Sequence, residues 1–528
     1  MSSFLSYKSV QRLLELSEHP VNLTEEAVLS SKRIEKMQMQ SSHLKLLYAT
    51  ERLGENTLEA LWELAKESEA LQKMQRMQRG EVINIIEGYP SEQRAVLHTA
   101  TRDFFEPCLS SACQSAAEHA YKELEKLTAF LKDIEQNQLF THIVQVGIGG
   151  SDLGPRAVYL ALKAYKKSHR EAHFIANVDP DDSYLLLSQL DLKKTLFVIV
   201  SKSGSTIETA SNEEIIREHL QQQGLDPRAH MVAVTCPGSP LDDTSRYLER
   251  FYIWDYVGGR YSVTSMVGAV VLAFTLGMDK FLDFLKGASL IDKIALKEEN
   301  NLPLLSALLS IWNRNFLHYS TQAIIPYSQA LERFPAHLQQ LNMESNGKGI
   351  DKKGAFIAYD TGAIYWGEPG TCCQHSFFQL LHQGTSIVPV EFIGFTHSQY
   401  PSSSMFMGTT AQQKLLANLL AQAVALATGQ RSYNPGKVFE GNRPSRILLA
   451  ERLDPMTMGA LLSYYEHAAA FQGFIWNINS FDQEGVQLGK VLASSFCNAF
   501  EKLNQGKDID AKDPSPVSSL MRQVHKLL

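Results

Sequence analysis

Spacings of three and four between apolar residues dominate the first part of the chain. Residues 1–105 carry leucines among many Glu, Lys and Gln residues, which predicts a helical segment. A clearer amphipathic helix follows, because its apolar side chains recur on one helical face; they are Ala117, Ala120, Leu124, Leu127, Leu131 and Ile134. This helix is expected to lead into the first buried strand.

Beyond residue 140, short apolar runs rich in β-branched residues alternate with helical stretches. That alternation is typical of βαβ units in a parallel sheet covered on both faces. The first series of expected strands is 143–146, 174–178, 196–200, 231–234 and 251–254. The second series is 323–325, 355–358 and 387–395. We therefore predict an α/β fold with two three-layer α/β/α sandwich domains whose sheets are mainly parallel.

The same pattern predicts where the domains begin and end. We expect a helical N-terminal segment at 1–105 that packs on the large domain, a first sandwich at 106–280 and a second at 281–502. A C-terminal arm is expected at 503–528, because the stretch 504–516 is polar and contains two prolines. The arm either docks on a protein surface or lies in solvent.

Composition excludes several classes of protein. The 528 residues carry a formal net charge of -7, which argues against a nucleic-acid binder, although local basic residues can still hold a small anion. The first residues lack the basic and apolar segments of a secretory signal, and the longest apolar run, 266–278, is shorter than a membrane span. The six cysteines form no C-x2-C pair. We expect a soluble cytoplasmic protein with reduced thiols and no metal site.

Two polar turns follow expected strands. The first, Gly147 to Pro155, contains Gly150 and Ser151, and its glycines would let backbone N–H groups approach a ligand. A ligand loop, a nicotinamide-cofactor loop and a merely tight turn all fit this segment. The second turn contains Ser201, Lys202, Ser203, Ser205 and Thr206 before a helix that opens near Glu208. It could cradle a phosphate without metal, and a hydroxyl-rich helix start with no ligand is the plain alternative.

Four further segments carry single residues suited to acid–base chemistry. Arg260 follows paired glycines and could stabilise a developing oxyanion, and Glu344 stands among Gln340 and other amides as a possible general base. His375 follows Cys372 and Cys373, which also permits a Cys–His nucleophile. Lys490 follows two glycines near the end of the chain. Each segment is a weak signal in isolation: a surface arginine in a turn is equally ordinary, and a solvated loop glutamate is more common than a general base.

In this order, the segments resemble the phosphoglucose isomerase family, whose members have the sugar isomerase fold. The segments DYVGGRYSVTSMVG at 255–268 and FDQEGVQLGK at 481–490 are similar to the two family signatures. Further matches are MESNGK at 343–348, GEPGT with QH at 367–375, HQGT at 382–385 and GNRPS at 441–445. The resemblance covers roughly residues 80–500.

The resemblance implies a role for each matching residue. Gly150 and Ser151 would contact the sugar, Gln340 would line the same pocket, and the 6-phosphate would be held by Ser201, Lys202, Ser203 and Thr206. His375, oriented by Glu208, would act with Lys490 in opening the sugar ring. Glu344 would move a proton between C2 and C1 of glucose 6-phosphate or fructose 6-phosphate, and Arg260 would stabilise the cis-enediol(ate).

The resemblance also implies a glycolytic and gluconeogenic isomerase without metal or organic cofactor. Family members are homodimers that take the histidine from the neighbouring subunit, so His375 would act in trans. Two departures are Gln487, where the family carries an acidic residue, and the Cys372–Cys373 pair. The rival interpretations are a nicotinamide-dependent dehydrogenase, suggested by the first turn and Asp179, and a sugar-phosphate-binding regulator without turnover.

Overall fold

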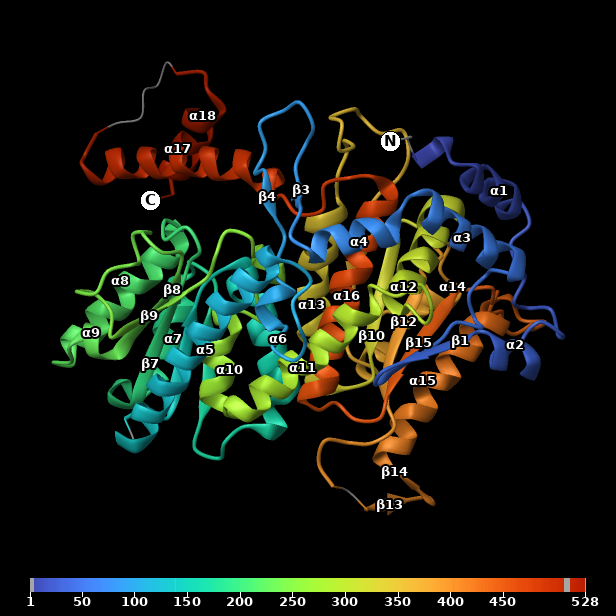
Figure 1. Cartoon of the computed structure of the whole chain (residues 1–528), viewed down its shortest axis with the longest axis horizontal. Coiled ribbons are helices and arrows are strands. Elements are labelled where there is room, and N and C mark those ends of the chain that lie inside the picture. Colours follow the sequence, from blue (N-terminus) through green and yellow to red (C-terminus); the bar gives the residue numbers. More distant parts are fainter. Residues whose placement is uncertain (1–3, 138, 402, 508–512, 528) are drawn as a thin grey trace. The chain divides into compact units, whose positions relative to one another are not determined.

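The computed structural model describes residues 4–137, 139–401, 403–507 and 513–527 (Figure 1). The chain divides into two compact units, Met1–Ser480 and Phe481–Leu528. The α-helices of the first unit are α1 (Lys8–Ser17), α2 (Ser31–Lys36), α3 (Glu55–Glu67), α4 (Ala70–Gln78), α5 (Ser111–Asn137), α6 (Leu153–Leu162), α7 (Pro180–Gln189), α8 (Ile207–Gln222), α9 (Pro227–His230), α10 (Met266–Leu276), α11 (Met278–Ile294), α12 (Leu302–Ile311), α13 (Phe334–Gln339), α14 (Phe378–Gln383), α15 (Ala411–Thr428) and α16 (Pro455–Trp476).

The first of the two larger sheets is parallel throughout, in the order β6-β5-β7-β8-β9. Its strands are β5 (His142–Val146), β6 (Glu171–Ile175), β7 (Thr195–Val200), β8 (Met231–Thr235) and β9 (Glu249–Tyr252). Helices cover both faces of this sheet. Val144 and Val146 pack with Ile216 of α8, whereas Gln145, which points to the opposite face, donates to the Val267 carbonyl of α10.

The second sheet is mixed, in the order β1-β2-β15-β12-β10-β11. Its strands are β1 (Gln38–Ser41), β2 (Leu44–Leu47), β10 (Thr321–Pro326), β11 (Ile364–Trp366), β12 (Val390–Phe395) and β15 (Ser445–Ala450). Phe392 packs toward α14 and α15 on one face. On the other face, beside α12 and α16, the adjacent Glu391 accepts hydrogen bonds from Arg446 and Tyr465. Two short hairpins pair β3 (Val82–Asn84) with β4 (Arg94–Ala95) and β13 (Met405–Phe406) with β14 (Thr409–Thr410).

The predicted α/β class with mainly parallel sheets is confirmed, and several element predictions are wrong. The N-terminal segment is not purely helical, because β1 and β2 extend the second sheet antiparallel to β15. Residues 355–358 form no strand; this loop is largely exposed, and Phe356 makes only an isolated bridge. Strand β6 covers Glu171–Ile175 instead of the predicted 174–178, and the residues after it lead into α7, which Asp179 caps. The predicted domain limits at 105, 280 and 502 stay a prediction.

Buried charges hold together segments that are far apart in the sequence. The Arg102 guanidinium donates to Asp292 of α11 at 2.6 and 2.8 Å and to Glu466 of α16 at 2.6 Å. His467 approaches the same Asp292 carboxylate at 2.6 Å. Because one guanidinium serves two desolvated carboxylates, burial raises the pKa of Glu466 to about 7. This cluster fixes α16 against α11 in the middle of the first unit.

One segment, Gly259–Leu276, is long and apolar enough to span a membrane by composition alone. Within the described residues, 94% of that window is buried inside the first unit, where α10 contacts the first sheet and α11. Helix α10 is therefore a core helix of the first unit. The second unit contains α17 (Gln487–Asn504) and α18 (Pro516–His525).

Candidate active site

A carboxylate and a guanidinium from two distant segments meet in the first unit. Arg260 Nη1 donates to Glu344 Oε2 at 3.1 Å. The Arg260 side chain is 1% exposed, whereas the Glu344 side chain is 24% exposed. A buried fixed cation beside a partly accessible carboxylate suits a reaction in which a base removes a proton and negative charge develops on oxygen.

The remaining donors of Arg260 are held by neighbouring groups. Its Nε donates to Ser345 Oγ at 2.7 Å and its Nη2 donates to the Ser480 carbonyl at 2.6 Å. The hydroxyl of Tyr261 lies 2.9 Å from the same Ser345 Oγ. The guanidinium orientation is thereby fixed before any ligand arrives.

Local backbone geometry explains why this pair forms. Arg260 lies in the 3-10 turn η6 (Gly259–Tyr261), directly before α10, whose first turn is capped by Ser265. Glu344 ends the π-helical segment η9 (Gln340–Glu344), which continues α13. Single π-helical turns within helices are frequent at functional sites, because they change the direction in which side chains project.

The first glycine turn packs against the Arg260 turn. Strand β5 ends at Val146, and Gly149 adopts a φ of +61° in the 3-10 turn η3 (Gly149–Ser151). A Cβ on Gly150 would lie 2.2 Å from the backbone carbonyl carbon of Gly259, so only glycine fits here. Gln340 Nε2 lies 3.3 Å from the position of a Cβ on Gly149. The structure therefore brings Gly150, Arg260 and Gln340 together.

The second predicted turn follows β7, the neighbour of β5 in the sheet. The Ser201 and Thr206 hydroxyls lie 3.0 Å apart, the Gly204 N–H donates to Ser201 Oγ, and the Ser205 hydroxyl donates to Ser203 Oγ. Thr206 precedes α8 without a side-chain cap, so the first N–H groups of that helix have no hydroxyl acceptor from it. Carboxyl ends of adjacent parallel strands share one edge of the sheet, which is where ligands bind in such folds.

The Lys202 side chain points away from the hydroxyl turn and contacts the segment 255–257. Its ammonium donates to the carbonyl oxygens of Asp255 at 2.9 Å and Val257 at 3.1 Å, and it lies 3.5 Å from the Asp255 carboxylate. Burial lowers the pKa of Lys202. These contacts tie the hydroxyl turn to the segment that leads into Arg260.

Glu208, His375 and Lys490 lie on three separate elements. Glu208 is half-buried in the first turn of α8, and His375 is exposed in the 3-10 turn η10 (Cys372–His375). No hydrogen bond or ion pair joins Glu208 to His375 in the described part of the chain. Lys490 is exposed on α17 of the second unit.

Comparisons with known proteins identify the family. The phosphoglucose isomerase family model matches residues 47–519. The chain belongs to the phosphoglucose isomerase family. It is 56% identical over 503 residues to a glucose-6-phosphate isomerase of Protochlamydia amoebophila, covering 94% of this chain and 93% of that protein. It is 52% identical over 494 residues to the corresponding protein of Chlamydia caviae, covering 93% of each.

A solved structure agrees with these relatives. The crystal structure of a glucose-6-phosphate isomerase from Chlamydia trachomatis superposes with a TM-score of 0.95 at 47% identity, covering 100% of both chains. Family membership confirms the predicted resemblance and extends it toward both ends, beyond the predicted range of 80–500. The dehydrogenase and the non-enzymatic regulator are therefore wrong interpretations, because the chain is an isomerase of this family.

Sequence reasoning missed the groups that orient the Arg260 guanidinium beside Glu344. Ser345, Tyr261 and Ser480 each contact Arg260 or its Ser345 partner, and none was a predicted site residue. Their place in the sequence could have identified them. Ser345 and Tyr261 directly follow Glu344 and Arg260 in the matching segments, and Ser480 directly precedes the segment 481–490. No group of three or more metal-binding side chains occurs among the described residues.

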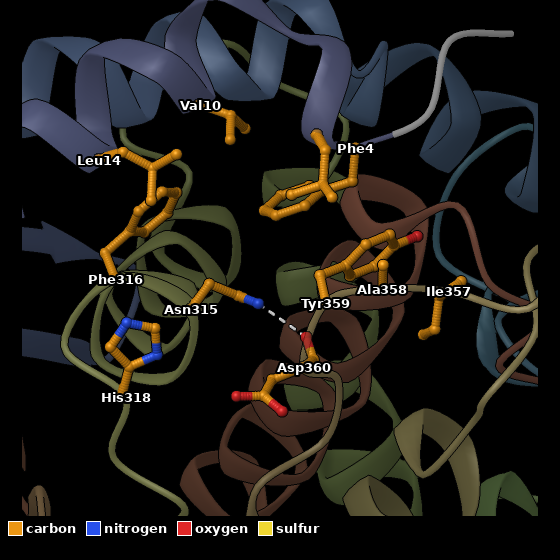
Figure 2. A pocket seen from close by; sticks show the side chains of 11 residues that line it. Phe4, Val10, Leu14, Asn315, Phe316, His318, Ile357, Ala358, Tyr359 and Asp360 are labelled. Atoms are coloured by element: carbon orange, nitrogen blue, oxygen red, sulfur yellow. Dashed lines mark hydrogen bonds between the residues drawn. The ribbon is translucent and has the colours of Figure 1, made fainter.

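The Arg260–Glu344 pair does not line the cavity beside α1. A cavity of about 450 Å³ lies between α1 and the π-helical segment η7 (Trp312–Phe316), lined mostly by apolar side chains and partly by His318, Asn315 and Asp360 (Figure 2). It contains none of the predicted site residues. The Asn315 amide N–H in Figure 2 already donates to the Asp360 carbonyl at 2.7 Å, so this donor is used within the protein.

Proposed function

We propose that Glu344 and Arg260 carry out the proton transfer by which this chain interconverts glucose 6-phosphate and fructose 6-phosphate. The isomerisation itself follows from the family and from relatives that are 50–56% identical. The 3.1 Å contact between Glu344 and the buried Arg260 is the observation that supports these two roles. Glu344 takes the proton from C2 or C1, and Arg260 stabilises the negative charge that appears on the cis-enediol(ate) oxygen.

The substrate phosphate is assigned to the hydroxyl turn. Ser201, Ser203 and Thr206 present hydroxyls at the uncapped start of α8, where the helix dipole favours an anion. Lys202 contributes positive charge and holds the turn at 255–257 in place. Gly150, Ser151 and Gln340 then contact the sugar. Consistent with this role, Gln340 Oε1 is buried without a hydrogen-bond partner in the described residues.

Ring opening is assigned to His375 and Lys490, with Glu208 orienting the histidine. Histidine suits this step because its ordinary pKa allows it to gain and lose a proton near neutral pH. His375 is exposed in the first unit, which supports its donation to a partner subunit rather than to its own Glu344. The homodimer, the cytoplasmic location and the absence of a cofactor are parts of the same proposal.

Exposed apolar side chains on the second unit support an association between chains. Helix α17 has no buried residue, and Leu488 and Val491 are 71% and 65% exposed. Such an apolar helix face is typical of an interaction surface. A second copy of the chain is the partner that family resemblance implies.

The direct test is turnover of fructose 6-phosphate by chelator-treated protein, followed through a dehydrogenase that consumes glucose 6-phosphate. We expect activity to survive chelation and Glu344→Gln to lower kcat about 10²-fold or more, because a general base is removed. Glu332→Gln is the matched control, since Glu332 is an exposed carboxylate close in sequence. Near-normal turnover by Glu344→Gln would remove Glu344 from the mechanism, and loss of activity on chelation would contradict a metal-free reaction.

A further inference from the structure

A cavity lined by cationic side chains lies at the amino ends of the strands of the first sheet, opposite the carboxyl ends where the candidate active site lies. It has a volume of about 280 Å³ and is lined by α5, the segment before β6 and the junction of α10 with α11. The segment before β6 reaches the amino end of the sheet, because Arg170 immediately precedes the first residue of β6. The Gly150 and Ser201 turns follow the carboxyl ends of β5 and β7. Figure 1 shows α5 and α10 beside this sheet and α11 next to α10.

Arg170 is the unusual residue of this cavity. It is 4% exposed, and both its Nε and Nη1 are buried without a hydrogen-bond partner in the described residues. Its guanidinium carbon lies 4.2 Å from the centre of the Phe274 ring. Burial lowers the pKa of Arg170, and Glu135 opposes that shift only as a second, weaker influence. A desolvated guanidinium with unused donors is costly unless an anion accompanies it.

The carboxylates that line the cavity are paired with lysines rather than with Arg170. Glu135 Oε1 accepts from Lys167 Nζ at 2.7 Å, and this contact lowers the pKa of Glu135. The Asp279 carboxylate lies 3.7 Å from Lys280. No ion pair involves Arg170 in the part of the chain that the structure describes. With Lys132 and Lys167, three cations line the cavity against two carboxylates, so positive charge is in excess.

The start of α11 adds donors to the same cavity. Gly277 precedes this 17-residue helix with a φ of +95° and provides no side-chain cap. The first amide N–H groups of a helix are free to bind an anion when no side chain caps them. A Cβ on Gly277 would lie 3.3 Å from Lys167 Cε and 2.8 Å from Asp279 Oδ1, so the side chains of Lys167 and of Asp279, the acidic residue of the first turn, both border this helix start.

We propose that this cavity is a second anion site that binds a phosphate group, either free phosphate or a small phosphate monoester. Arg170 donates to the phosphate oxygens through Nη2, because its Nε and Nη1 are enclosed by protein. Lys132 and Lys167 add charge from the rim, and the N–H groups at the start of α11 complete the donor set. The cavity can hold a phosphate group together with a short carbon chain. This site is separate from the hydroxyl turn that holds the substrate phosphate.

The test is a binding titration of the full chain with inorganic phosphate. We expect two equivalents per chain in the wild type, whereas Arg170→Met and the double variant Ser201→Ala, Thr206→Val should each keep only one equivalent at wild-type affinity. Losing the charged hydrogen bonds of Arg170 should weaken its site roughly tenfold or more. Turnover by Arg170→Met should stay at the wild-type level. Each variant weakens a different phosphate site. A wrong assignment of the hydroxyl turn is therefore distinguishable from a wrong assignment of the Arg170 cavity.

Unchanged stoichiometry and affinity in Arg170→Met would overturn the second site. If that variant does not fold, Lys132→Met replaces it, because Lys132 is exposed and its loss should weaken only the Arg170 equivalent. Glycerol 3-phosphate, added as a competitor, distinguishes the two ligand sources. Displacement of phosphate from the Arg170 site assigns it to monoesters, whereas the lack of displacement assigns it to free phosphate.

Discussion

At the scale of single residues, the site depends on how completely Arg260 is anchored. Ser345 and the Ser480 carbonyl occupy its Nε and Nη2, which leaves Nη1 directed at Glu344. An electrostatic group that is fixed beforehand stabilises developing charge without reorganising during the reaction. Ser345 is therefore a positioning residue, and it is completely buried.

Ser345→Ala should lower kcat about tenfold and leave KM nearly unchanged, because the guanidinium loses one anchor while phosphate binding is untouched. Steady-state kinetics on both substrates measures this separation. Tyr261→Phe is the comparison variant, since it removes the other hydroxyl on Ser345, which also contacts Arg260, but keeps the bond from Arg260 Nε to Ser345. A smaller loss is expected for that variant. A rise in KM alone after Ser345→Ala would contradict the positioning role.

Lys202→Ala should lower kcat as well as raise KM. Sequence reasoning alone predicts a KM effect, because a ground-state phosphate contact is lost. The structure adds a kcat effect, since the Lys202 ammonium also holds the carbonyls of Asp255 and Val257 before Arg260. Lys193→Ala, an exposed lysine on the same domain surface, controls for loss of charge. If only KM changes, Lys202 is a phosphate contact without a supporting role.

At the scale of elements, α13 carries a buried titratable group next to the π-helical segment that ends at Glu344. His337 is 1% exposed, neither ring nitrogen has a hydrogen-bond partner in the described residues, and burial lowers its pKa to about 4. The folded state therefore keeps His337 neutral at pH values where the unfolded chain, with a histidine pKa near 6.5, already binds the proton.

The free energy of unfolding is therefore unaffected by His337 above pH 6.5 and falls as the pH drops from 6.5 toward 4. The loss amounts to about 3 kcal/mol of unfolding free energy. His337→Leu should flatten the fall in stability over this range, as measured by chemical denaturation at several pH values. His43→Gln, at an exposed histidine, should leave the wild-type slope. Equal slopes for wild type and His337→Leu would disprove the assignment.

The elements also indicate how far sequence patterns reach. Apolar runs located all five strands of the first sheet, since parallel strands buried on both faces are continuously hydrophobic. The same reasoning missed β15, whose Ser445 and Arg446 are polar but buried in hydrogen bonds with Thr50 and Glu391. It also missed the edge strand β1 and its neighbour β2, because strands of four residues that carry polar side chains such as Gln38 and Lys45 have no distinctive apolar run.

Candidate residues were found from matching segments, but their contacts were not predictable from them. Arg260 and Glu344 are 84 residues apart, and only the packing of η6 against η9 brings them to 3.1 Å. The direction of Lys202 toward 255–257 likewise depends on β7 and β9 lying in one sheet, two positions apart. The sequence shows which side chains are present for catalysis, whereas tertiary packing decides which of them come into contact.

At the scale of the whole molecule, the proposed active site needs two chains, because Glu344 and His375 would come from different subunits. A homodimer with two-fold symmetry contains two such sites, each combining one residue from each chain. This arrangement makes Glu344→Gln and His375→Ala complementary rather than equivalent defects. In a mixed dimer, one site receives both substitutions and the other receives neither.

Mixing the two inactive variants, with subunit exchange by mild unfolding and refolding, should therefore restore activity. Random pairing makes half of the dimers mixed, and each mixed dimer has one intact site, so about a quarter of wild-type turnover is expected. Refolding each variant alone gives the baseline, and mixing Glu344→Gln with wild type controls for dominant effects. If His375 served its own chain, every site would keep one defect and mixing would restore nothing, which would refute donation across the interface while leaving the role of Glu344 intact.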